Sequence, residues 1–265
     1  MKNAFMFLLL CCTPVLFFGQ GAEATDCFQS LFNPATKVRN KATIKLVRNK
    51  QVQTLNLFLA NELTGLEQKL ALKDLDGDGV AELVIYSFTG GAHCCDEFYF
   101  FKNTGTNRYT QVAKLFAGNT CVSGNTFLFD FAEPFGYFYT CYACELEGKK
   151  NSKGETYERL ANISLQYKNG KLVTEPGTTA LKEKLLRNLR YVKSLGWDGG
   201  VKQGEFDDGR RKALAHSLAV YYFSFGKNAV ELKTLFKQYY PFKDAAAVWK
   251  DFREQLTNMQ SQNSF

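Results

Sequence analysis

Acidic side chains are most concentrated in the run Asp-Leu-Asp-Gly-Asp-Gly-Val-Ala-Glu, which begins at Asp74. With Asp76 and Asp78 at positions three and five, three carboxylates would converge on one centre in a tight loop. The backbone carbonyl of Val80 at position seven and the carboxylate of Glu82 at position nine would add further ligands. An all-oxygen set in a flexible loop favours calcium over zinc and magnesium. The run therefore predicts a calcium site; a solvated acidic turn is the alternative.

The loop differs from an EF-hand, which needs a glutamate at position twelve between two helices. Position twelve here is Ile85, inside an apolar run that predicts a strand. An Asp-x-Asp-x-Asp-Gly-x-x-Glu loop before such a strand resembles the calcium hairpin of FG-GAP repeats, the propeller blades of integrin alpha chains and of many exported bacterial proteins. The likeness covers about residues 71–115, where Phe101-Lys102-Asn103-Thr104-Gly105 is similar to the next strand and turn of a repeat. It implies a calcium-tied hairpin in a sheet that is at most partly propeller-like, because only one complete acidic motif is present.

The N-terminal segment has the layout of a secretory signal peptide. Lys2 gives it a positive start, residues 4–10 are apolar, and small and polar residues follow the apolar part. We expect residues 1–20 to be removed, with cleavage between Gly19 and Ala24. The mature chain would then be secreted or periplasmic.

A lipoprotein anchored through Cys11 is the alternative, disfavoured because Leu10, and not a small residue, precedes that cysteine. No other run is long and apolar enough to span a bilayer. The formal charge falls from +7 to +6 when Lys2 leaves, and it is spread along the chain. An exported chain without a basic block is not expected to bind nucleic acid.

Six cysteines remain after the leader, and an even number in an exported chain predicts disulfides. They allow 15 pairings. Cys94 and Cys95 are adjacent, so their side chains point to opposite faces of an extended chain, and we expect them to have different partners among the other four. The cysteines are Cys27, Cys94, Cys95, Cys121, Cys141 and Cys144.

A zinc site is the alternative use of the same residues. His93 with one neighbouring cysteine, together with Cys141 and Cys144, would complete a His/Cys tetrahedron. An oxidising compartment favours disulfides over thiolate ligands. A redox role for the Cys-x-x-Cys pair is disfavoured, because it follows a β-like run and does not start a helix.

Few residues could act as a catalytic base, because the chain has two histidines. His216 is expected on the exposed face of a helix, opposite Leu214, whereas His93 lies beside other reactive groups. Glu133 and Glu145 could form a pair of glycosidase carboxylates on proximity in the sequence alone. No serine-hydrolase, metalloprotease or phosphate-binding motif is present. The sequence therefore favours a role other than catalysis.

Alternation of apolar and polar residues, with many of the 24 Phe and 13 Tyr, predicts strands through the first two thirds of the chain. Asn169-Gly170 predicts a tight hairpin turn. The expected strands are 41–48, 51–59, 70–72, 83–88, 97–102, 109–115, 126–131, 137–142, 163–167 and 171–173.

The periodicity changes to about 3.6 residues after residue 178, which predicts amphipathic helices. They are expected at 180–196, from about 209 to 225, at 230–239 and at 244–259. The predicted fold class is α+β, an antiparallel sheet followed by helices. The expected organisation is a β-rich calcium-binding domain at 25–175, a helical region at 178–260 and a frayed tail at 261–265.

Three functions fit these features. The first is a non-catalytic envelope protein whose calcium- and disulfide-stabilised sheet binds a glycan, a peptidoglycan fragment or a protein, with exposed Phe and Tyr on the sheet. The second is a metal-assisted hydrolase that uses His93. The third is a periplasmic inhibitor or immunity-type protein with a protruding loop at 90–96.

Overall fold

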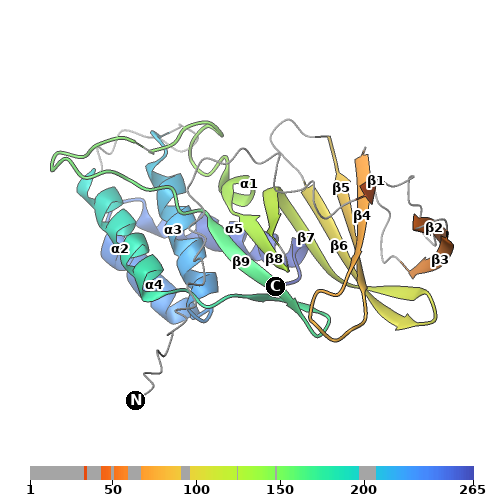
Figure 1. Ribbon diagram of the computed structural model, residues 1–265. Helices are drawn as coiled ribbons and strands as arrows, with labels where there is room; N and C mark the ends of the chain where they lie inside the picture. The colour runs from red at the N-terminus through yellow and green to blue at the C-terminus, as the bar shows by residue number, and fades with distance from the viewer. Residues whose placement is uncertain are drawn as a thin grey trace, which may run out of the picture.

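The computed structural model describes residues 33–34, 43–48, 51–58, 67–90, 96–123, 125–146, 148–196 and 207–265. The predicted signal peptide and the loop with His93 lie outside these ranges. Figure 1 shows the strands in one part of the molecule and the long helices packed together beside them. The α+β class, with helices toward the C-terminus, is confirmed.

Strands fill the first two thirds of the described chain. Most of them lie within a few residues of the predicted ranges. Their bounds are β1 (Asn33–Pro34), β2 (Thr43–Arg48), β3 (Gln51–Phe58), β4 (Glu67–Lys73), β5 (Glu82–Phe88), β6 (Asp96–Gly105), β7 (Arg108–Ser123), β8 (Thr126–Asp130), β9 (Asn162–Lys168) and β10 (Lys171–Thr174).

The strands join in one curled sheet in the order β1-β4-β5-β6-β7-β8-β9-β10. Neighbours along this path are antiparallel. The β2–β3 hairpin attaches through a parallel pairing of β3 with the start of β7. A propeller-like arrangement is not confirmed, because the described strands follow this single path.

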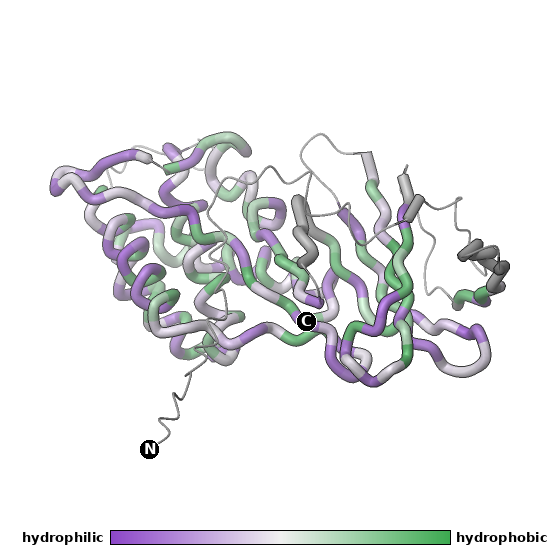
Figure 2. Tube along the Cα trace, in the orientation of Figure 1, coloured by the Kyte–Doolittle hydropathy of each residue, from purple (hydrophilic) through white to green (hydrophobic). Residues whose placement is uncertain are grey.

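The central strands bury both faces of the sheet, because successive side chains of a strand point to opposite sides. On β6, Phe98 and Phe100 pack in the large core shared with the helices, whereas Tyr99 and Phe101 pack in a smaller core on the other face. Leu55 of β3 helps to form that second core. Figure 2 shows hydrophobic residues along these strands and more hydrophilic ones in the connecting loops.

Five helices are present in the described residues. The helix α3 lies at the centre of the helical group (Figure 1) and is buried on all sides, including Arg211 and Lys212 near its start. The expectation that His216 is exposed is therefore wrong: α3 packs against neighbours all around it, and the imidazole is fully buried. The helices are α1 (Ala132–Phe135), α2 (Thr179–Ser194), α3 (Arg210–Ser224), α4 (Ala229–Tyr239) and α5 (Ala245–Gln262).

Two segments differ from the sequence prediction. The expected strand at 137–142 is an irregular loop, preceded by the short α1. The expected frayed tail packs against the sheet: the N–H of Ser264 donates to the carbonyl of Lys114 (2.9 Å), and the Phe265 ring packs against Phe129 (4.9 Å between ring centroids). In both segments, contacts with residues distant in the chain decide the conformation.

Candidate metal site

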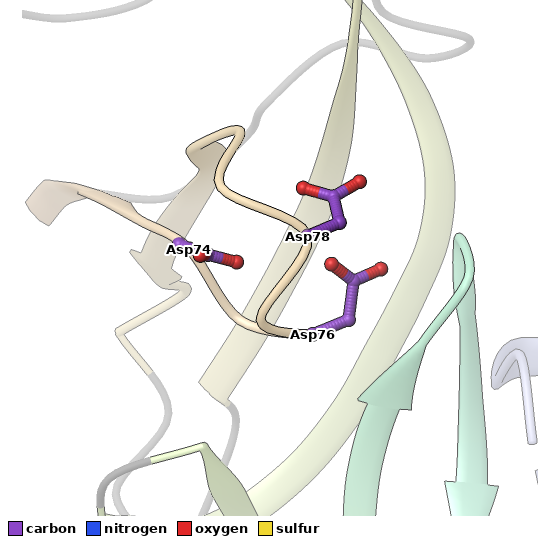
Figure 3. Close-up of side chains that lie close together, drawn as sticks. All are labelled: Asp74, Asp76 and Asp78. Atoms are coloured by element: carbon purple, nitrogen blue, oxygen red, sulfur yellow. The ribbon is translucent and has the colours of Figure 1, made fainter.

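The acidic loop connects β4 to β5 at one end of the sheet. Gly77 and Gly79 have φ angles of 80° and 84°, a left-handed conformation that glycine adopts without strain. These two turns bring the carboxylate oxygens of Asp74, Asp76 and Asp78 within 4.8 Å of one another. Figure 3 shows the three side chains around the bend of the loop.

Backbone N–H groups hold the aspartates in this arrangement. Asp74 accepts from the N–H of Gly77 (2.7 Å) and of Gly79 (2.9 Å), and Asp78 accepts from the N–H of Val80 (2.8 Å). Such bonds orient the carboxylates and leave further lone pairs on each of them for a cation.

A second hairpin closes on the loop from a distant part of the chain. The backbone N–H of Asn169, in the β9–β10 turn, donates to Oδ2 of Asp76 (3.0 Å). Asn169 and Gly170 both have positive φ angles, 51° and 79°, as the predicted type I′ turn requires. The β9–β10 turn therefore contacts the acidic loop directly through this hydrogen bond.

Several oxygens beside the aspartates are buried without a hydrogen-bond partner. Glu82 is fully buried; its Oε2 accepts from the N–H of Leu75 (2.8 Å), and its Oε1 has no partner. Oδ1 of Asp76 and the hydroxyl of Tyr167 are also unpartnered. Unpaired buried oxygens cost about 1–3 kcal/mol each. An oxygen-binding cation at this place would remove part of that cost.

Repulsion between negative charges also disfavours the ionised form of Glu82. Burial raises the pKa of the Glu82 carboxyl, the N–H of Leu75 opposes this effect, and the negative charges of Asp76 and Asp78 raise it further. Burial and the negative charges of Glu82, Asp76 and Asp78 raise the pKa of the Tyr167 hydroxyl. The carboxylates of this region thus repel one another. Their oxygens are ligands of the kind that a hard divalent cation prefers.

The structure brings three of the five predicted ligands together. Glu82 is not in the group of oxygens within 4.8 Å and lies buried beside it. The side chain of Val80 is exposed, and its N–H is used by Asp78. Sequence reasoning missed the contribution of Asn169, since nothing local to that turn indicates contact with a loop 93 residues away.

The Cys-x-x-Cys pair closes on itself. Cys141 and Cys144 form a disulfide, with 5.1 Å between their Cα atoms. They are therefore not partners of Cys94 or Cys95, and their sulfurs do not complete the zinc tetrahedron proposed with His93. His93, Cys94, Cys95 and Cys27 lie outside the described residues, as does the side chain of Cys121.

Buried charges gather where α3 begins. The Arg211 guanidinium donates to Asp244 (2.7 Å) and to the hydroxyl of Tyr240 (3.0 Å), and lies 3.5 Å from Asp207. The Lys212 ammonium contacts Glu145 (3.0 Å). These groups join α3 to the loop after α1 and to the start of α5.

Among the residues that the structure describes, no helix combines the length and apolar character needed to cross a membrane. Comparison with protein-family models, curated proteins and solved structures finds no match to the chain.

Proposed function

We propose that this chain is an exported, calcium-stabilised, disulfide-bonded protein of the cell envelope with a binding role and no catalytic one. The observation that carries the calcium assignment is the unpartnered, fully buried Oε1 of Glu82 beside three converging aspartates. An acidic turn that is merely solvated has no reason to bury a fourth carboxylate.

Calcium would link three parts of the fold. The acidic loop joins β4 to β5, Glu82 begins β5, and the β9–β10 turn bonds Asp76 through Asn169. A cation that neutralises the loop would therefore stabilise the sheet between distant strands. This is the expected behaviour of a structural ion.

Thermal unfolding of the mature protein tests the assignment. At a calcium concentration 100 times Kd, binding adds about 2.7 kcal/mol to the free energy of unfolding. For a chain of this size, that raises Tm by about 5–10 °C over the value in chelator. Magnesium and zinc at equal concentration are expected to give smaller shifts.

Two variants localise the effect. Asp76→Asn combined with Asp78→Asn should abolish the calcium-dependent rise in Tm. Glu183→Gln, on the exposed surface of α2, removes a carboxylate elsewhere and should leave the rise unchanged. An identical Tm in calcium and in chelator for the unmodified protein would refute the calcium assignment.

A further inference from the structure

The loop that replaces the expected strand at 137–142 is held in an unfavourable conformation. Tyr139 has a φ angle of 57°, which residues other than glycine rarely adopt. Its carbonyl accepts from the N–H of Asp207 (2.8 Å), and its hydroxyl bonds Asp251. The Arg211 guanidinium lies 4.6 Å from the centre of its ring. Strain held by so many contacts is characteristic of functional loops.

Two further restraints hold the C-terminal part of the loop. The buried ammonium of Lys212 donates to the carbonyl of Tyr142 (2.7 Å) and pairs with Glu145 (3.0 Å). The Cys141–Cys144 disulfide closes the bend between these contacts. The loop is therefore preorganised, so that a ligand would not have to order it.

The restrained loop presents two tyrosine rings. The Tyr137 side chain is 66% exposed and is the one aromatic among the large exposed hydrophobic residues of the described chain. The Tyr142 ring packs 5.6 Å from it, at an angle of 52°. A Cβ on Gly136 would lie 2.5 Å from the Tyr142 ring, so only glycine permits this packing. Exposed Phe and Tyr on the sheet would have supported a binding surface there, but none of the described strand residues is an exposed Phe or Tyr.

Carboxylates and a guanidinium surround the tyrosine pair. Glu133 accepts from the Tyr142 hydroxyl at 3.5 Å. The Arg159 guanidinium donates to both oxygens of Asp130 at 3.1 Å and lies 3.9 Å from Glu145. Burial, followed by the charges of Glu133 and Asp130, raises the pKa of the Tyr142 hydroxyl to about 12, so it remains a donor at neutral pH.

We propose that Tyr137, Tyr142, Glu133, Glu145 and Arg159 form a binding site for an uncharged saccharide. The apolar face of a pyranose would stack on the exposed ring of Tyr137. Its hydroxyls would donate to the two glutamates and accept from Arg159. A cationic partner fits less well, because Arg159 already pairs with the carboxylate of Asp130 and Lys212 with that of Glu145. The proposal depends on the binding role proposed above and not on the calcium site.

Binding of the mature protein to an array of immobilised glycans, with isolated peptidoglycan as a further probe, tests the proposal. We expect a saccharide to bind and Tyr137→Ala to weaken its affinity by roughly tenfold or more, as loss of a central aromatic contact does. Tyr137→Phe should retain binding, because it keeps the ring. Val173→Ala, which alters another exposed apolar residue, should bind like the unmodified protein.

Each outcome is decisive for one of the two proposals. Failure to bind any glycan, equal binding by Tyr137→Ala, or selective binding of a lysine-rich peptide would overturn the saccharide site. Because Tyr137 is on the surface, the Ala variant should keep its calcium-dependent Tm, which also confirms that it is folded. Glycan binding that depends on Tyr137 but persists in chelator, without any effect of calcium on Tm, would refute the calcium site alone.

Discussion

Replacing Glu82 by glutamine should have opposite effects on stability in chelator and in calcium. Without a cation, the substitution removes a buried charge that Asp76 and Asp78 repel. The new amide keeps an oxygen to accept from the N–H of Leu75, which now bonds Oε2 at 2.8 Å. With calcium bound, the same substitution removes a carboxylate that the cation attracts.

The magnitudes follow from the burial of this side chain. Glutamine leaves a neutral unpartnered atom in place of a charged one, and an unpartnered buried group costs about 1–3 kcal/mol when neutral and more when charged, so we expect Glu82→Gln to stabilise the calcium-free protein by about 1 kcal/mol. This corresponds to a rise in Tm of about 2–4 °C. Loss of a group beside the ligands weakens metal affinity about 10–100-fold, or about 1.4–2.7 kcal/mol. At the same calcium concentration, the calcium-induced rise in Tm should therefore shrink by about 3–9 °C.

Differential scanning calorimetry in chelator and at fixed free calcium measures both effects. Glu97→Gln is the matched control, because Glu97 is a buried glutamate on the adjacent strand that pairs with Lys114 (3.1 Å) and accepts from Tyr99 (2.7 Å). It should lower Tm equally in both conditions. A lower Tm for Glu82→Gln in chelator, or an undiminished calcium shift, would refute the reasoning.

Two further predictions concern acid stability and the disulfide. Burial, with the charges of Arg159 and Lys212, holds the pKa of His216 well below 6.5. The unfolded chain takes up a proton below pH 6.5 and the folded chain does not, so stability should fall as pH decreases, by up to about 1.4 kcal/mol per pH unit. His216→Leu should reduce that slope in urea titrations at pH 7 and 5.5; an unchanged slope contradicts the assignment. Cys141→Ser with Cys144→Ser should destabilise by only about 2 kcal/mol, because the closed loop is short. A peptide map that links Cys141 to Cys94 would contradict this pairing.

Local signals predicted the parts of the fold that local chemistry determines. The acidic loop forms because glycines alternate with short acidic residues, and Asn169-Gly170 forms its turn because both residues tolerate positive φ angles. Strand and helix ranges followed from periodicity for the same reason. The three aspartates could therefore be identified as a group before the fold was known.

Contacts between distant segments account for what the sequence did not predict. Residues 137–142 look like a strand, but Asp207 and Arg211 hold Tyr139, and Lys212 holds Tyr142, in an irregular loop. His216 is buried because helices and a strand surround α3 on all sides. Glu82 was expected as a ligand; it lies buried at the start of β5, where it accepts from the N–H of Leu75 and stays outside the group formed by the three aspartates.

The bonding of residues 263–264 to the middle of β7 constrains the order of folding. Lys114 and Phe116 lie between the parts of β7 that pair with β3 and with β8, and their N–H groups donate to side-chain oxygens of Ser264 and Asn263. These contacts cannot form until residue 264 has been synthesised, and they close a loop of about 150 residues. A nascent chain can therefore complete this part of the sheet only late in synthesis.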